Sequence, residues 1–510
     1  MNFTIRYSPI GLVLACGLIA ASCGAGSSTV HVAKVDPPHE VIADGGTGWP
    51  LPGHDYANSR DAVGSTLRAS TINRIAPAWS IATPGALTTA ALIVGNTVYA
   101  EDDHGVVVAA DKKTGRALWQ SVSTGFTVGP EGVAVGWGKV FAATADGIEA
   151  LDAKSGQVLW TRRLTESATA GVDMQPTVIG HRVLTATVPV SAAVQYQGGD
   201  RGYLFAVDAS SGKVDWSFDT VASKNLWGHP GVNSGGGAWY PPAIDTGTGI
   251  VYWGTANPAP FPGTPQYPNG SSRAGPNLYT DSTVALSLAT GRLIWYRQAV
   301  PHDLFDQDFV HALLVKVNNG ATSGQVVVGT GKGGQLLGMN PASGHLLWKT
   351  SVGIHENHSL TALPGPTSVL PGTYGGVLTP PASADGKVYV ATLNAATVLS
   401  PVKTAYFGGK VGTMNGEVVA IDAANGKHLW DTSIPGDPTG GATVVNDLVI
   451  TGTLQGNLVA IDRTTGKIAW THGVGYPISG WPSVAGDLLV VPTGMVASSG
   501  HLMAFRMPTG

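Results

Sequence analysis

Three aspartates stand close together in the stretch that follows Pro301, namely Asp303, Asp306 and Asp308. Carboxylate oxygens are preferred ligands of hard cations such as calcium, and a positioned carboxylate can also remove a proton from a substrate. The same residue type caps turns by accepting hydrogen bonds from nearby backbone amides. Taken alone, these residues favour the turn-capping interpretation, so the rest of the chain has to decide whether this loop carries chemistry.

Other residues suited to a polar site also have simple structural interpretations. Trp239 alone would most often be a core residue, and Asn257, which precedes a proline, is typical of a turn. Lys332 stands between two glycines, as at a solvated hairpin tip, and His302 is more typical of a structural residue than of a catalytic one. The 14 histidines are otherwise scattered without metal-binding spacing. Function therefore depends on whether the fold brings these positions together.

The two cysteines, Cys16 and Cys23, restrict the redox chemistry that the chain can use. Both lie in an N-terminal leader, so the mature domain is predicted to have no disulfide, no thiolate metal site and no Cys-x-x-Cys-His haem attachment. Any redox chemistry would need another cofactor.

The N-terminal leader has the pattern of an export signal. Residues 10–21 are almost entirely apolar and follow Arg6, but they are fewer than the ~20 residues that span a bilayer. The small residues before Cys23 resemble the bacterial lipoprotein processing box, which predicts a signal peptide at residues 1–22 and lipidation of Cys23. Ala20 departs from that box, so ordinary cleavage and release is the alternative. Residues 23–48 are small and polar and predict a flexible tether, with the folded domain at residues 49–510.

Composition excludes several function classes. The 510 residues contain 29 Lys and Arg against 33 Asp and Glu, a formal net charge of −4, and only 12% charged residues. Soluble domains usually carry about 25% charged residues. A basic nucleic-acid binder and a charge-rich disordered chain are therefore both disfavoured.

An internal repeat is the strongest signal in the sequence. Each copy has an alternating apolar run, then Asp or a substitute, Gly four residues later and Trp four residues after that. The Asp can bond turn amides, Gly supplies a positive φ, and Trp can wedge between neighbouring sheets. Eight tryptophans mark eight units, with the first and last strands completing one unit: Trp79, Trp119, Trp160, Trp216, Trp295, Trp348, Trp430 and Trp470.

The repeat predicts an all-β, eight-bladed β-propeller with Trp-docking repeats. A four-stranded blade needs about 40 to 50 residues, whereas successive tryptophans are 40 to 82 residues apart. The surplus predicts four long insertions. A closed ring also leaves no exposed sheet edge.

The repeat resembles the pyrroloquinoline-quinone (PQQ) propeller repeat over nearly the whole mature chain. Non-enzymatic scaffold propellers, including outer-membrane assembly lipoproteins, carry the same pattern, so the repeat implies a fold more than a function. Segments outside the repeat resemble the quinoprotein alcohol and sugar dehydrogenases in their order and spacing: residues 49–60, 235–239, 254–260, 301–308 and 331–334.

This resemblance implies a PQQ-dependent, metal-assisted dehydrogenase of an alcohol or sugar outside the cytoplasmic membrane. The leader predicts that only a lipid anchor holds it to the outer face of that membrane, with secretion as the alternative. Electrons would pass to a separate cytochrome or membrane quinone. It implies Asp306 as the general base, Trp239 and Lys332 as cofactor-binding residues, and calcium or a lanthanide as the metal. The implied metal ligands are Gln197, Asn257, Asp306 and Asp308.

Three departures from the family pattern support a second hypothesis. Gln197 stands where a metal-binding Glu is common, and Glu131 stands where an arginine often faces a cofactor carboxylate. Thr88 or Thr89 aligns with a position that is often acidic. The alternative is therefore a non-catalytic PQQ-repeat lipoprotein that binds a protein or polymer in the cell envelope.

Overall fold

The computed structural model describes residues 35–43, 47–127, 129–189, 198–318, 323–403 and 412–508. All of these residues belong to one compact unit. The predicted signal peptide at residues 1–22 and two predicted site residues, Cys23 and Gln197, lie outside the described residues.

Eight antiparallel sheets of four main strands form the blades, which confirms the predicted eight-bladed propeller. Seven of them are consecutive in sequence. Their strands are β3 (Leu92–Val94), β4 (Thr97–Glu101), β5 (Val107–Asp111) and β6 (Ala117–Gln120); β7 (Val133–Gly136), β8 (Lys139–Thr144), β9 (Gly147–Asp152) and β10 (Val158–Arg163); β11 (Thr177–Ile179), β12 (Arg182–Ala186), β13 (Tyr203–Asp208) and β14 (Val214–Asp219); β16 (Ala243–Asp245), β17 (Ile250–Gly254), β19 (Ser282–Ser287) and β20 (Leu293–Gln298); β21 (His311–Asn318), β22 (Ser323–Thr330), β23 (Gln335–Met339) and β24 (Leu346–Ser351); β26 (Ala382–Ala384), β27 (Lys387–Leu393), β29 (Gly416–Asp422) and β30 (His428–Ile434); and β31 (Thr443–Val445), β32 (Leu448–Gly452), β33 (Asn457–Asp462) and β34 (Ile468–Gly473).

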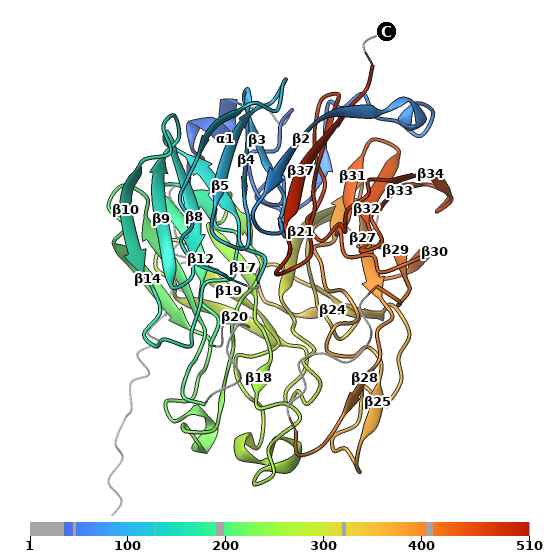
Figure 1. Cartoon of the computed structure of the whole chain (residues 1–510). Helices are drawn as coiled ribbons and strands as arrows, with labels where there is room; N and C mark the ends of the chain where they lie inside the picture. The colour runs from blue at the N-terminus through green and yellow to red at the C-terminus, as the bar shows by residue number, and fades with distance from the viewer. Residues whose placement is uncertain are drawn as a thin grey trace, which may run out of the picture. The chain divides into compact units, whose positions relative to one another are not determined.

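The eighth blade closes the ring with strands from both ends of the domain. β2 (Ala76–Thr83) pairs antiparallel with β37 (Gly500–Arg506), which continues to β36 (Leu488–Pro492) and β35 (Ser483–Ala485). Figure 1 shows blue β2 beside red β37. The first and last strands therefore complete one blade, as the repeat predicts.

Each repeat turn is built as its sequence predicts. In the first, the Asp111 carboxylate accepts hydrogen bonds from the Lys113 and Thr114 amides at 3.2 and 2.8 Å, and Gly115 has a φ of 71°. The indole of Trp79 lies over Gly115 and donates from Nε1 to the Lys112 carbonyl at 3.1 Å. Bonds of this kind fasten seven outer strands to the turn of the following blade. Equivalent indole bonds are made by Trp119, Trp160, Trp216, Trp295, Trp348 and Trp430.

The glycine beneath the indole has no room for a side chain. Gly156 has a φ of 73°, and a Cβ there would lie 2.5 Å from Cε3 of Trp119. Gly138, in the same blade, has a φ of 71° but nothing within 4 Å of a Cβ. We expect Gly156→Ala to cost about 1 to 3 kcal/mol more unfolding free energy than Gly138→Ala, because only the former overpacks the indole. Urea unfolding of both variants measures this difference, and equal losses would contradict it.

Residues 49–60 form a plug that bonds to the first strands of several blades. The carbonyls of Tyr56, Ala57 and Arg60 accept bonds from amides on β16, β21 and β31 respectively. The Arg60 side chain is 1% exposed. The guanidinium lies 5.2 Å from the ring centre of Trp49 and 5.6 Å from that of Trp481. The plug leads into β1 (Asp61–Ala62), which pairs parallel with β31, and a 3-10 turn η1 (Ile72–Arg74) precedes β2.

Contacts with the propeller begin before the predicted start of the domain at residue 49. A short helix, α1 (His39–Ala43), lies in the stretch predicted as a tether. The carboxylate of Glu40 accepts hydrogen bonds from the Trp137 and Gly138 amides, at 2.9 and 2.6 Å. This part of the tether is therefore in contact with the β7–β8 hairpin.

Four inserted segments carry additional strands and turns. Before β16 and after β17 lie η2 (Leu226–Gly228) with β15 (Ser234–Gly235), and β18 (Pro258–Ala259) with η3 (Pro268–Arg273); before β26 and after β27 lie β25 (Thr367–Val369) and β28 (Thr397–Leu399). β15 pairs with β18, and β25 with β28. Figure 1 shows β18, β25 and β28 extending beyond the blades on one side of the ring.

Candidate active site

A cavity of about 490 Å³ lies among the insertions and the ends of several blades. Its wall includes Trp239, Asn257, Asp306, Asp308 and Lys332. Five of the residues implied by the family resemblance, far apart in sequence, therefore line one space. Gln197 lies outside the described residues, so its position relative to this cavity stays a prediction.

The ammonium of Lys332 bridges two carboxylates at the cavity wall. Its Nζ lies 3.0 Å from Oδ2 of Asp306 and 2.6 Å from Oδ2 of Asp308. The other oxygen of Asp308 accepts a bond from the Asn257 amide at 2.8 Å. The side-chain amide nitrogen of Asn257 donates to the Pro258 carbonyl at 3.0 Å, which leaves Oδ1 as the atom that can accept from or coordinate a ligand.

Backbone constraints place the two aspartates. Asp303 is fully buried, and its carboxylate accepts bonds from the Phe305 and Gln307 amides at 2.7 and 2.6 Å. Asp306 and Asp308 then take positive φ angles of 61° and 32°, which is uncommon for residues with side chains. Asp303 thus does cap a turn, as its residue type suggests, while the two aspartates after it face the cavity.

Gly331 allows the β22–β23 turn that carries Lys332 to approach the aspartate loop closely. A Cβ on Gly331 would lie 1.6 Å from the Asp308 carbonyl oxygen. The same carbonyl accepts a bond from the Lys332 amide at 3.1 Å. Lys332 is therefore a half-buried residue of the cavity wall, with 16% of its side chain exposed, and not a solvated hairpin tip.

Burial dominates the electrostatics of this group. Desolvation raises the pKa of Asp306 well above its ordinary value; the Lys332 charge opposes this increase, and that of Asp308 adds to it. For Lys332, desolvation lowers the pKa, but Asp306 and Asp308 more than offset it, so its pKa is raised. Lys332 is therefore charged, and it is the counter-ion of the two carboxylates.

An aromatic wall faces these charges. Trp239 lines the cavity with its Nε1 buried and without a hydrogen-bond partner among the described residues. The Tyr240 hydroxyl donates to the Leu378 carbonyl at 2.6 Å, and its ring centre lies 5.6 Å from that of Trp481. Tyr240 and Trp481 also line the cavity, and sequence reasoning did not select them. For Tyr240, its place directly after Trp239 was the one available signal.

Arg273 is a further residue that sequence reasoning missed. It is fully buried, donates to the Pro260 carbonyl at 3.1 and 3.0 Å and to the Asn277 side chain at 2.7 Å, and also donates to the Asp303 carbonyl. It therefore joins the insertion to the aspartate loop. His302 lies beside it and contacts the Gly275 carbonyl at 3.2 Å, which agrees with a structural role.

The departures at Thr88, Thr89 and Glu131 lie together in the interior. The Thr88 hydroxyl contacts Glu131 Oε1 at 3.3 Å, and that of Thr89 donates to the Glu131 carbonyl at 2.8 Å. Glu131 is fully buried, whereas Thr88 and Pro130 line the cavity. Burial raises the pKa of Glu131 to about 8 and that of neighbouring Asp173 to about 7. Glu131 is therefore mostly protonated at neutral pH and does not present a full negative charge.

The raised pKa of Glu131 predicts a pH-dependent stability. The folded state holds the proton with a pKa of about 8 against an ordinary value of 4.5. The stabilisation is therefore complete below about pH 4.5 and is lost as pH rises through 8. Between pH 5 and 9 the unfolding free energy should therefore fall, and we expect Glu131→Gln to reduce this fall by on the order of 4 kcal/mol. Chemical unfolding between pH 5 and 9 measures the unfolding free energy of the wild type and the variant, with exposed Glu166→Gln as the control. A parallel decline in the wild type and both variants would show that Glu131 does not cause the pH dependence.

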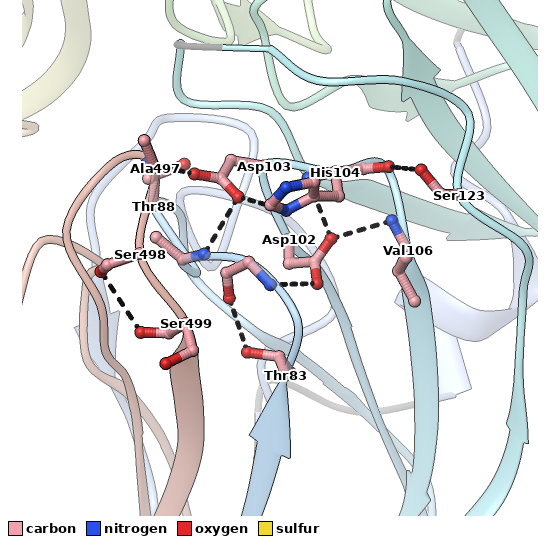
Figure 2. Close-up of polar contacts among 12 residues, drawn as sticks. Thr83, Thr88, Asp102, Asp103, His104, Val106, Ser123, Ala497, Ser498 and Ser499 are labelled. Atoms are coloured by element: carbon pink, nitrogen blue, oxygen red, sulfur yellow. Dashed lines mark hydrogen bonds and ion pairs between the residues drawn. The ribbon is translucent and has the colours of Figure 1, made fainter.

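One rim of the cavity is fastened by a network of buried carboxylates. Figure 2 shows Asp103 directed toward Ala497, whose amide donates to Oδ2 at 2.9 Å. The other oxygen accepts from the Ala86 amide at 3.1 Å and lies 3.0 Å from Nδ1 of His104. Because Met495 and Val496 line the cavity, Asp103 joins this rim, which lies between β36 and β37 of the closing blade, to the β4–β5 loop of the next blade.

Comparison with known proteins agrees with this architecture. The family profile "Glucose/ethanol/alcohol dehydrogenase, beta-propeller domain" matches residues 165–356, and the profile "Outer membrane protein assembly factor BamB" matches residues 66–187 and 414–510. These PQQ-repeat matches fall within the eight-bladed propeller, and the relatives of the chain include quinoprotein alcohol dehydrogenases.

Among curated proteins, quinohemoprotein alcohol dehydrogenase ADH IIB of Pseudomonas putida is 26% identical over 378 residues, covering 68% of this chain and 52% of that protein. A dehydrogenase subunit of the quinone-dependent alcohol dehydrogenase of Acetobacter aceti is 30% identical over 256 residues, covering 44% of this chain and 34% of that one. The chain thus spans about half the length, or less, of these curated relatives.

Solved structures show the same fold. The quinohemoprotein alcohol dehydrogenase from Comamonas testosteroni has a TM-score of 0.77 at 21% identity, covering 91% of this chain and 82% of that one. A europium-containing methanol dehydrogenase has a TM-score of 0.76 at 21% identity, covering 92% and 100%. BamB from Moraxella catarrhalis has a TM-score of 0.53 at 16% identity, covering 86% and 98%. Within the described ranges, no helix is long and apolar enough to cross a membrane.

Proposed function

We propose that the protein is a PQQ-dependent, metal-assisted oxidoreductase that oxidises an alcohol, with a sugar as the other substrate class compatible with the family. The observation that carries this proposal is the convergence of Asn257, Asp306, Asp308, Lys332 and Trp239 on one cavity. Relatives that are quinoprotein alcohol dehydrogenases support the same reaction class.

The residues of the cavity fit such a cofactor and its metal. A cavity of about 490 Å³ falls within the usual size of small-molecule sites. Among the described residues the indole nitrogen of Trp239 has no hydrogen-bond partner, and the indole itself offers a flat aromatic surface. Carboxylate and amide oxygens suit a hard cation. When bound, a metal-polarised ortho-quinone supplies the hydride acceptor.

Side chains of the protein would accept the proton, hold the metal and orient the cofactor. Asp306 would accept the hydroxyl proton of the alcohol, since it is a buried carboxylate at the cavity wall. Asn257 and Asp308 would hold the metal through oxygen atoms, together with Asp306 and the predicted ligand Gln197. Trp239 would orient the planar cofactor, and Lys332 would balance the negative charge of the site.

The proposal includes an exported protein that passes electrons to a separate cytochrome or membrane quinone. Calcium and a lanthanide are both compatible with the oxygen ligands. Its attachment through Cys23, after removal of residues 1–22, rests on the leader sequence.

Titration of the purified domain with PQQ and either calcium or lanthanum tests the function. A ligand present at about 100 times its dissociation constant should stabilise the fold by about 2.7 kcal/mol. We expect a metal-dependent rise in melting temperature together with a change in cofactor absorbance. No response with either metal would overturn the proposal.

A second candidate function is favoured by one observation. The BamB profile matches both ends of the domain, residues 66–187 and 414–510. A non-catalytic propeller that binds a protein or polymer would give no response to cofactor and metal, and it would retain an envelope partner in a pull-down.

A further inference from the structure

Ser234 is a buried hydroxyl of the cavity wall that has no role in the proposed reaction so far. It is fully buried, lines the cavity, and its Oγ has no hydrogen-bond partner among the described residues. A buried hydroxyl without a partner costs about 1 to 3 kcal/mol. The hydroxyls of Ser479 and Thr439, which also line the cavity, instead donate to the Gly494 and Ile478 carbonyls at 2.6 and 2.8 Å. The Ser234 hydroxyl is therefore available to a ligand.

The β15–β18 ribbon places Ser234 on the same side as Asn257. Ser234 pairs with Ala259, and Gly235 pairs with Pro258. Directly opposite residues of an antiparallel pair share a face, as do residues two apart on one strand. Asn257, Ala259 and Ser234 all line the cavity, as does Gly235. Diagonal neighbours of this kind lie roughly 7 to 8 Å apart at the backbone, within reach of one shared ligand.

A metal in this cavity would need more oxygen ligands than Asn257, Asp306 and Asp308 supply. No group of three or more His, Cys, Asp or Glu suited to a metal is found in the part of the chain that the structure describes. Asp306 and Asp308 supply two carboxylates and Asn257 one amide oxygen, whereas calcium takes about six to eight oxygen ligands. The Gly199 amide donates to the Asn233 carbonyl at 3.0 Å and Ser234 pairs with Ala259, so Ser234 lies between the segment at Gly199 and β18, which directly follows Asn257.

We propose that Ser234 Oγ is an additional oxygen ligand of the metal in this cavity, beside Asn257 and the two aspartates. This inference rests on the proposed function and names a ligand that residue type and motif spacing did not indicate. It explains why a hydroxyl is kept unpartnered in a cavity where other hydroxyls bond the backbone.

Terbium binding to the purified protein without PQQ tests the inference. Tryptophan-sensitised terbium emission reports binding independently of turnover, because Trp239 lines the same cavity. We expect Ser234→Ala to weaken terbium affinity by about tenfold or more, the scale seen when a metal site loses a supporting group. Ser234→Cys, which keeps the side-chain shape but replaces the hard oxygen with a larger, soft sulfur, should weaken terbium affinity similarly. The matched control Ser479→Ala removes a hydroxyl that bonds the backbone and should leave affinity unchanged.

Asp308→Asn separates failure of this inference from failure of the proposed function. If the wild-type protein binds terbium and Asp308→Asn loses it while Ser234→Ala does not, Ser234 is no ligand and the metal site stands. If the wild-type protein does not bind terbium, or if Asp308→Asn binds it unchanged, both the inference and the metal-assisted reaction are overturned.

Discussion

Asp306→Asn is expected to abolish alcohol-dependent dye reduction by the protein loaded with PQQ and metal, with a loss of at least about 10³-fold in kcat. The amide has nearly the same shape as the carboxylate, and its oxygen can still accept the bond from Lys332 that the structure shows at 3.0 Å. It cannot accept the proton of a substrate hydroxyl. Activity should therefore disappear while the melting temperature changes little.

Steady-state dye reduction at saturating alcohol, with melting curves on the same samples, measures this effect. Asp245→Asn is a matched control, because Asp245 accepts bonds from the Gly247 and Thr248 amides in the β16–β17 turn, away from the cavity. The control should retain its turnover. Full turnover of the Asp306 variant would exclude it as the base.

Arg60→Ala is expected to give the largest loss of stability, on the order of 3 to 5 kcal/mol. The guanidinium is 1% exposed. It donates from Nε to the Ala442 carbonyl at 2.7 Å, from Nη1 to the Pro52 carbonyl at 3.2 Å, and from Nη2 to the Thr443 hydroxyl at 2.9 Å. Truncation would leave these buried acceptors without a donor and would open a void between two indoles. Burial lowers the pKa of Arg60 to about 9, so it stays charged at neutral pH.

Equilibrium unfolding in urea measures the change, with Arg463→Ala as the control. Arg463 pairs with Asp385 at 2.6 Å, but that carboxylate is 69% exposed, so the pair should contribute at most about 1 kcal/mol. Similar losses for the two variants would show that the plug does not stabilise the ring through Arg60.

The architecture could be predicted because each blade repeats the same local physics. The Asp turn, the positive φ of Gly115 and the indole of Trp79 are local or neighbouring features, and copying them around a ring fixes the number of blades. The position of β2 was also predictable, since Trp79 lacks the beginning of its own unit.

The cavity was only partly predictable, because its wall combines segments that no repeat relates. Asp306, Asn257 and Trp239 carried a family pattern, whereas Tyr240 and Trp481 are set by how the insertions and the closing blade meet. The orientation of a side chain is equally invisible in sequence. Glu131 aligned as a charge against the cofactor, yet the structure buries it outside the cavity lining that the described residues form.

The closing blade also has a consequence for how the molecule folds. β2 is synthesised early, but its partner β37 comes more than 400 residues later. Contacts of such long range are slow to form, since the entropy of closing the loop is lost before the contacts compensate for it. Until then β2 presents an unpaired edge, and such edges invite association with other chains. Seven blades can form one after another along the chain, so closure of the eighth blade is the last step of folding. A chaperone that shields β2 would act between the synthesis of β2 and its pairing with β37.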